Sequence, residues 1–149
     1  QFLAFCFCSV YISSATSEPE IISTQHEIIT YLNHTAKFSC LIKNRNQKHV
    51  TWSRVNFIND TQKLANLLYV DQLKYTPFNR YHLSHSIDSN KNEEHWDLEI
   101  RQVHLADQGY YSCVLTAIKP ISKIFYLKVI GKITNQIETQ TLVILFSFR

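Results

Sequence analysis

The segment from Asp107 to Cys113, with the sequence DQGYYSC, constrains the fold of this chain more than any other stretch. Asp107 is typical of the start of a tight turn, and Gly109 accepts backbone angles that residues with a Cβ atom adopt reluctantly. The turn predicts a strand after it, from Tyr111 to Thr116. Because side chains alternate along a strand, Tyr111 and Cys113 share one of its faces. A tyrosine placed here can turn its hydroxyl back to the preceding loop and fix the corner.

A second cysteine and a tryptophan lie upstream of this corner. Cys40 is in the alternating segment AKFSCLI, which predicts a strand from Ala36 to Ile42, and Trp52 is in the following segment HVTWS. A cysteine, then a core tryptophan, then a cysteine behind a tyrosine corner is typical of immunoglobulin-like sandwiches. We therefore predict an all-β fold in which two Greek-key sheets face each other and are joined by one disulfide.

The N-terminal segment predicts export. Residues 2–12, FLAFCFCSVYI, are apolar and uncharged, and small residues follow up to Ala15. This pattern resembles the hydrophobic part and cleavage site of a secretory signal peptide whose basic start is missing. We interpret residues 1–15 as a partial signal peptide. A buried first strand is the alternative, because a short apolar run fits both.

The number of cysteines then predicts the disulfide. Cleavage would remove Cys6 and Cys8, so that Cys40 and Cys113 remain as the cysteines of the exported chain. An even number of cysteines in an oxidising compartment indicates a bridge, here between Cys40 and Cys113. Two buried free thiols are the alternative.

Three candidate strands lie between Trp52 and Trp96, at residues 64–70, 73–76 and 81–84. Trp96 itself begins the segment WDLEI, in which large apolar residues alternate with charged ones as in a half-buried strand. This number of strands favours the variable (V) type of sandwich, which adds the edge strands C′ and C″ to one sheet.

We assign residues 18–131 to one V-type domain. The tail that follows, residues 132–149, ends in the apolar run LVILFSF, which is too short to cross a membrane as a helix. Two interpretations of this tail stay open: the beginning of a membrane span or lipid-anchor signal, and non-coding sequence that has been read through. Association with a membrane would require the missing or truncated anchor.

Composition and motifs argue against nucleic-acid binding and catalysis. The net charge is +3, and the 15 basic and 12 acidic residues are interspersed, so no basic stripe of the kind that binds nucleic acid is predicted. The chain has two glycines, too few for a phosphate-binding loop, and no G-x-S-x-G or H-E-x-x-H motif. His82 and His85 lie three apart in a predicted strand and point to opposite faces, so they are poor co-ligands. We predict no enzyme activity, no metal site and no cofactor.

The second half of the chain carries a more specific resemblance. The sequences LLYV, LKYT, NRY, WDLEIRQV and DQGYYSC, with the spacing from Cys113 to Pro120, resemble the first domain of the Dpr and DIP neuronal receptors, and lachesin and the IgLON adhesion proteins are similar. The resemblance covers residues from about 35 to 130. It implies that Arg80 pairs with Asp107 beneath the sandwich, where a guanidinium and a carboxylate suit a bidentate ion pair.

Several apolar side chains have no predicted role in the core and fall on the sheet that carries strands C, C′, C″, F and G. An exposed patch of aliphatic and tyrosine side chains is unfavourable in water unless a partner covers it, and tyrosine is enriched at interfaces. The alternative is that some of them point inward, because alternation alone does not fix the facing of C′ and C″. The predicted binding face comprises Ser53, Val55, Tyr69, Leu73, Tyr75, Val114, Thr116, Ile118 and Ile121.

Together these features predict an extracellular recognition or adhesion domain, secreted or at the cell surface. The resemblance implies that its binding face docks on the same sheet of a like or related immunoglobulin domain of a surface receptor. The alternative is a secreted single-domain factor, a decoy or immune modulator, that binds a non-immunoglobulin ligand through its loops. Two Asn-x-Thr sequons, at Asn33 and Asn59 in predicted turns, predict N-glycosylation and agree with export.

Overall fold

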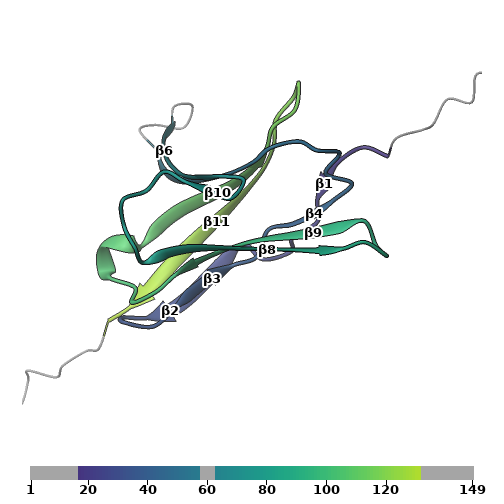
Figure 1. Ribbon diagram of the computed structural model, residues 1–149. Coiled ribbons are helices and arrows are strands. Elements are labelled where there is room, and N and C mark those ends of the chain that lie inside the picture. Colours follow the sequence, from purple (N-terminus) through teal and green to yellow (C-terminus); the bar gives the residue numbers. More distant parts are fainter. Residues whose placement is uncertain (1–16, 58–62, 132–149) are drawn as a thin grey trace, which may run out of the picture.

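Two β-sheets face each other in the computed structural model, which describes residues 17–57 and 63–131 (Figure 1). One sheet has five strands, with β9 pairing β3, β4 and β8, and β1 pairing β4: β1 (Glu20–Ile21), β3 (Ala36–Phe38), β4 (Leu41–Lys43), β8 (Tyr81–Asp88) and β9 (Glu93–Ile100). The other has six strands in the order β2 (Glu27–Tyr31), β11 (Ile121–Ile130), β10 (Gly109–Leu115), β5 (Val50–Phe57), β6 (Lys63–Val70) and β7 (Leu73–Lys74).

This arrangement is the V-type sandwich that the sequence predicts. Strands β6 and β7 continue the sheet beyond β5 in the places of C′ and C″, and the pairing of β2 with β11 is parallel whereas the other pairings are antiparallel. A short 3₁₀ helix, η1 (Leu105–Asp107), leads into β10. The predicted signal peptide, residues 1–15, and the tail, residues 132–149, lie outside the described residues.

The strand predicted from Ala36 to Ile42 is divided into β3 and β4 in the structure. The interruption arises because backbone amides here bond to side chains instead of to a neighbouring strand. The N–H of Ser39 donates to Oε1 of Gln25 (3.2 Å), and the N–H of Leu41 donates to Oγ of Ser23 (2.7 Å). The segment before β2 thereby takes over hydrogen bonds that an uninterrupted ladder would make.

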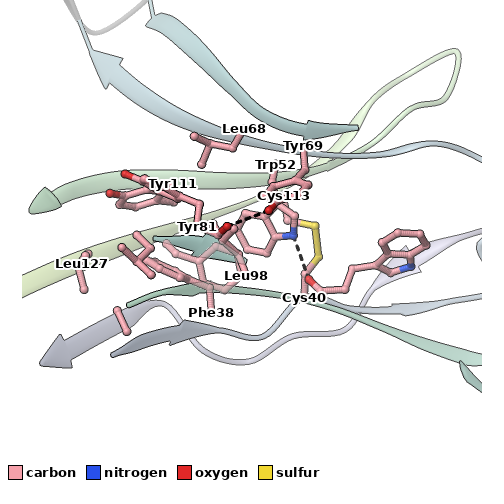
Figure 2. Packing of buried hydrophobic residues seen from close by; sticks show 14 of the residues in the cluster. Phe38, Cys40, Trp52, Leu68, Tyr69, Tyr81, Leu98, Tyr111, Cys113 and Leu127 are labelled. Carbon is pink, nitrogen blue, oxygen red and sulfur yellow. Dashed lines mark hydrogen bonds between the residues drawn. A yellow bond between two sulfur atoms is a disulfide. The ribbon is translucent and has the colours of Figure 1, made fainter. Parts of the chain in front are cut away.

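The predicted disulfide is present and connects the two layers. Cys40, between β3 and β4, is bonded to Cys113 of β10 across a sequence separation of 73 residues, and both are fully buried. A loop of this length contributes about 4 kcal/mol in the chain-entropy model, because the bond restricts the unfolded chain. Figure 2 shows the Trp52 indole beside the disulfide, and its Nε1–H donates to the carbonyl oxygen of Trp96 (2.9 Å) on the opposite sheet.

Aromatic rings fill the space next to the disulfide and the Trp52 indole. Phe38 lies 4.8 Å from Tyr111 and 6.0 Å from Trp52 between ring centroids, and Phe125 lies 5.4 Å from Trp52. These residues come from both sheets and are among the largest fully buried side chains. Aromatic contacts with these separations add to the free energy gained from burial alone.

Hydrogen bonds to the main-chain carbonyl and to the side-chain carboxylate of Asp107 fix the corner before β10. The hydroxyl of Tyr111 donates to the Asp107 carbonyl oxygen (2.8 Å), and Gly109 has a φ of +141°, which L side chains rarely adopt. The Asp107 carboxylate accepts two hydrogen bonds from Arg80 (2.7 and 2.9 Å) and one from the N–H of His104 (2.8 Å). Burial alone raises the pKa of this carboxyl, but Arg80 and His104 outweigh the effect and hold the pKa below its ordinary value.

This ion pair gives the free energy of unfolding a defined pH dependence. Because the folded-state pKa of Asp107 is depressed, its stabilisation is complete above the unfolded-state pKa, about 3.9, and is lost as pH falls through the folded value. We expect Asp107→Asn to lower the free energy of unfolding by about 3 kcal/mol at pH 7, because Arg80 loses its buried partner. The difference from the unmodified protein should shrink below about pH 4 in urea titrations at a series of pH values.

Asp88→Asn is the matched control for this experiment. Asp88 is more exposed and faces Lys91 at 3.7 Å, so its loss should change the free energy of unfolding by less than about 1 kcal/mol. If the Asp107 variant and the unmodified protein differ in free energy of unfolding by the same amount at pH 3 and at pH 7, the stabilising role assigned to the Asp107–Arg80 ion pair is contradicted.

Candidate binding face

Strand register defines which side chains leave the six-stranded sheet on its outer side. Trp52 is the cross-strand partner of both Cys113 and Tyr69, and all three point into the core. Residues of the opposite parity point outward, and directly opposed residues of neighbouring strands share a face. We call the following three cross-strand rows the central face: Leu73, Val70, Thr51, Val114 and Ser122; Leu67, Ser53, Ser112 and Ile124; Ala65, Val55, Tyr110 and Tyr126.

The central face contains no charged side chain. The exposed fractions of its larger apolar residues are 66% for Leu73, 41% for Tyr110 and 38% for Leu67. The nearest charges around the rows are Glu27, opposite Tyr126 on β2, Lys128, the next outward residue of β11, and Lys63, the next outward residue of β6. A partner that covers the central face therefore removes apolar surface from water without having to desolvate an ion.

Aromatic contacts hold one part of this face in place. The ring of Tyr110 lies 5.0 Å from that of Phe57 in an edge-to-face arrangement and 4.9 Å from that of Tyr126. Phe57, at the end of β5, is itself about half exposed. Because these rings support one another before any partner arrives, their rotamers lose little freedom on binding.

A groove of about 260 Å³ opens beside the central face, toward the edge formed by β6 and β7. Its lining includes Leu67, Tyr75 and Phe78, which are exposed, and Tyr81, which is buried. Tyr75 follows β7, and its N–H donates to the carbonyl oxygen of Leu68 (2.9 Å), so this segment stays beside β6. Arg54, Asn66 and Thr76 also line the groove, so it offers a recess of mixed polar and apolar character that a side chain of a partner can enter.

Five residues of the predicted binding face are at least partly exposed on the outer side or the edge of the sheet. Leu73 and Tyr75 are exposed at the β7 edge, and Val114 is half-buried in the first row. Thr116 is exposed just after β10, where its N–H and hydroxyl both donate to the carbonyl oxygen of His49 (2.8 and 3.1 Å). Ile118 is fully exposed at the tip of the β10–β11 hairpin.

The prediction was wrong for Tyr69 and Ile121. Tyr69 is buried in the core, and its hydroxyl donates to the carbonyl oxygen of Tyr81 (2.9 Å). A bulge in the pairing of β5 with β6 leaves Leu68 without a partner opposite it, and the extra residue reverses the facing of every residue beyond it. Ile121 is opposite the buried Leu115 and packs against the core from the inner side of β11.

Ser53 and Val55 point outward as predicted, but they are almost fully buried, with exposed fractions of 7% and 2%. Their cross-strand neighbours on the same face are Leu67 and Ser112 for Ser53, and Ala65 and Tyr110 for Val55. They support the larger side chains of the central face, and the structure corrects their expected role as contact residues.

Sequence reasoning missed Tyr110, Leu67 and Tyr126. Tyr110 has the same parity as Ser112 and Val114 in β10, so the alternation pattern alone could have placed it on the outer face. Leu67 could not be found in this way, because the bulge at Leu68 leaves no mark in the sequence that fixes its position.

His85, one of the two histidines considered above as metal ligands, is engaged by other side chains in the structure. His85 stacks on Trp96 at 3.8 Å, and its Nε2 lies 2.9 Å from Glu94, which also accepts hydrogen bonds from Arg45 (2.8 and 2.9 Å). Burial raises the pKa of the Glu94 carboxyl, but Arg45 and His85 outweigh this and bring it below its ordinary value. Among the residues that the structure describes, no group of three or more His, Cys, Asp or Glu side chains could hold a metal ion, and no helix is long and apolar enough to span a membrane.

The family model of the immunoglobulin V-set domain matches residues 23–129. The chain belongs to the immunoglobulin V-set family. Domains of this family are binding modules rather than enzymes. A search of curated proteins gave no match to this V-set chain.

Solved structures of Dpr, DIP and RIG immunoglobulin domains are similar to this V-set domain, as the sequence resemblance predicted. A chain of the Dpr2 Ig1–Ig2 complex with DIP-Theta Ig1–Ig3 is 25% identical, with a TM-score of 0.62, over 78% of this chain and 49% of that one. This V-set chain thus spans about half the length of that relative. The RIG-5 Ig1 homodimer (23% identical, TM-score 0.63, 76% and 99% covered) and Dpr1 Ig1 bound to DIP-eta Ig1 (22%, 0.62, 78% and 100%) have the same fold.

Two substitutions test whether the central face consists of exposed residues that can contact a partner and buried residues that support them. Val55→Asp places a charge where 2% of the side chain is exposed, and we expect it to lower the free energy of unfolding by about 3 kcal/mol. Leu73→Asp changes a residue that is 66% exposed and should alter the free energy by no more than about 0.5 kcal/mol. Urea denaturation measures both, and equal losses would contradict the assigned roles.

Proposed function

We propose that this V-set domain is an extracellular recognition or adhesion module that binds another immunoglobulin domain through its central face. The observation that carries the proposal is the continuous absence of charge over three cross-strand rows, combined with exposed leucine and tyrosine side chains. A domain that stays monomeric in water seldom exposes a contiguous apolar patch. The core of a protein interface, in contrast, is apolar and poor in charged residues, as this face is.

The geometry of the face suits a protein partner rather than a small molecule. It is spread over five strands of one sheet, and the disulfide and the Trp52 indole hold that sheet against the other layer. A rigid face binds with less loss of conformational freedom than a loop does. The half-exposed rings of Tyr110 and Phe57 are of the type that dominates the binding energy of protein interfaces. An interface of standard size would bury about 1,200–2,000 Å² in total.

The class of partner is argued from the related structures. Dpr2 was solved in complex with DIP-Theta, Dpr1 Ig1 bound to DIP-eta Ig1, and RIG-5 Ig1 as a homodimer. In all three assemblies one immunoglobulin-domain protein binds another. An uncharged face can meet a like face without repulsion between equal charges, which agrees with a partner of the same or a related kind.

An extracellular location is consistent with three features of the chain. The Cys40–Cys113 disulfide requires an oxidising compartment, the side chain of Asn33 in the first sequon is exposed, and residues 1–15 have the pattern of a signal peptide. The second sequon residue, Asn59, lies outside the described residues. We propose that the domain acts at the cell surface or after secretion.

The tip of the β10–β11 hairpin favours a second candidate function, that of a soluble factor which binds a non-immunoglobulin ligand through its loops. Ile118 is fully exposed there and borders a groove of about 360 Å³ that Pro19 and Lys48 also line. The two candidate functions use different surfaces, so substitutions can separate them.

The first step is to screen the secreted domain against a panel of extracellular immunoglobulin-domain proteins that includes the domain itself. For the partner found, we expect Tyr110→Asp and Tyr75→Asp each to raise Kd by at least about 30-fold, because a charge would have to be desolvated at the centre or edge of the contact. Surface plasmon resonance measures the affinity, and circular dichroism shows that the variants remain folded.

Ile87→Asp is the matched control, because Ile87 is at least as exposed as Tyr75 and Tyr110 but lies on β8 of the other sheet. It should change Kd by no more than about twofold. If Ile118→Asp abolishes binding while both tyrosine variants bind normally, the hairpin tip is the docking surface and the central-face proposal fails; a screen in which the domain binds a non-immunoglobulin ligand and no immunoglobulin domain would favour the second candidate function.

A further inference from the structure

A second apolar patch, separate from the central face, lies at the β2 edge of the same sheet. Ile29, Tyr31 and Ile130 form it, with exposed fractions of 57%, 59% and 36%. They share the outer side because Tyr31 is opposite Ile130 in the parallel pairing, and Ile29 lies one outward position before Tyr31. Glu27 and Lys128 separate this corner patch from the central face. A partner seated on the central face would have to bury these charges in order to reach it.

The corner patch ends directly at a turn that carries a sequon. The N–H of His34 donates to the carbonyl oxygen of Tyr31 (3.0 Å), and the N–H of Asn33 donates to that of Val103 (2.8 Å). Asn33 has a φ of +64°, which asparagine accepts more readily than most residues. Asn33 and Thr35 are both exposed, so the complete Asn33–His34–Thr35 sequence stands in an accessible, hydrogen-bonded turn.

We propose that Asn33 carries an N-linked glycan whose first N-acetylglucosamine packs on Tyr31 and covers the corner patch. In the secretory pathway, Nδ2 of Asn33 attacks C1 of an oligosaccharide that is carried on a polyprenyl pyrophosphate. The bond between C1 and Nδ2 forms, the bond from C1 to the pyrophosphate oxygen breaks, the lipid pyrophosphate leaves, and Nδ2 loses one proton. No oxidation or reduction is involved.

The chemistry of the two surfaces is complementary. The C–H groups on one side of a pyranose ring form an apolar surface that packs on the electron-rich face of an aromatic ring, while the sugar hydroxyls remain in water. Tyr31 lies two residues before Asn33, and its backbone is tied to the turn by the hydrogen bond from His34. Its ring is 5.8 Å from that of His34, so the aromatic surface lies beside the sequon rather than away from it.

The glycan also divides the outer side of the sheet between two occupants. A branched oligosaccharide at Asn33 would exclude a protein from the β2 edge and leave the central face free for docking. The inference rests on the proposed extracellular function for its route through the secretory pathway, but it concerns a different group of residues.

Occupancy is tested on the full chain, secreted from glycosylating cells behind a secretion leader, with Asn59→Gln in every sample so that Asn33 is the sole remaining sequon. We expect peptide-N-glycosidase to reduce the mass of the protein by that of one oligosaccharide, and peptide mapping to place it on Asn33. Thr35→Ala should abolish the modification, and it leaves the positive-φ residue unchanged. A secreted, folded protein without a glycan at Asn33 overturns the proposal.

Packing on Tyr31 is tested by the change in Tm when the glycan is removed enzymatically. We expect Tm to fall by about 4 °C in the protein with Tyr31, a shift that one modest interaction gives in a domain of this size. In Tyr31→Ser the fall should be close to zero. Tyr75→Ser is the matched control, because Tyr75 is similarly exposed at the opposite edge, and it should keep the full shift.

The outcomes separate this inference from the proposed function. An equal fall in Tm in Tyr31→Ser and in the protein with Tyr31 overturns the packing on Tyr31, whatever the binding data show. If Asn33 is glycosylated and removal of the glycan lowers Tm as expected, while Tyr110→Asp binds its partner normally, the proposal that the central face docks fails and the glycan proposal stands. If the glycosylated and deglycosylated forms bind the partner equally well, the corner patch and the central face are independent surfaces, as the positions of Glu27 and Lys128 indicate. A partner that binds only the deglycosylated form would contradict this division of the sheet.

Discussion

The bond between Cys40 and Cys113, with the Trp52 indole beside it, is the interaction on which the rest of the structure depends. It joins the two sheets covalently, and the hydrogen bond from the indole to the Trp96 carbonyl oxygen (2.9 Å) crosses the same gap. Trp52 and Cys113 are cross-strand partners and both face inward. Their positions therefore determine which of the remaining side chains of β5 and β10 face inward and which face outward. The outer side of the sheet therefore follows from the core: once the sulfur and the indole are inside, Tyr110 and Val114 must point outside.

The corner at Asp107 and the central face are two results of this arrangement. The corner fixes where β10 begins, through the Tyr111 hydroxyl and the ion pair with Arg80, and the start of β10 sets the register of its neighbours. With the register fixed, uncharged side chains of five strands come together on one side, while Glu27 and Lys128 mark its limit toward β2. Recognition is thus a property of the packed sheet rather than of any single motif in the sequence.

The fold could be predicted from the sequence because its determinants are local and chemically distinctive: the alternation around Cys40, the glycine at the corner, and the tyrosine two residues before Cys113. The family resemblance to Dpr and DIP domains was also readable, and the comparisons confirm it. The binding face was only partly predictable. Alternation placed Val114 correctly, but it could not fix the facing of β6 and β7, where one unpaired residue, Leu68, moved Tyr69 into the core, and burial of Val55 depends on neighbours in other strands. Such effects belong to tertiary packing and leave no signal in a single sequence.

The central claim is that the outer side of the six-stranded sheet meets the partner. The most direct measurement is hydroxyl-radical footprinting of the domain, alone and in its complex, read out residue by residue by mass spectrometry. We expect oxidation of Tyr110, Leu67 and Tyr75 to fall several-fold in the complex, while oxidation of Ile87 on the other sheet stays the same. Protection of Ile118 and the neighbouring loops, with Tyr110 and Leu67 oxidised equally in both states, would contradict the account.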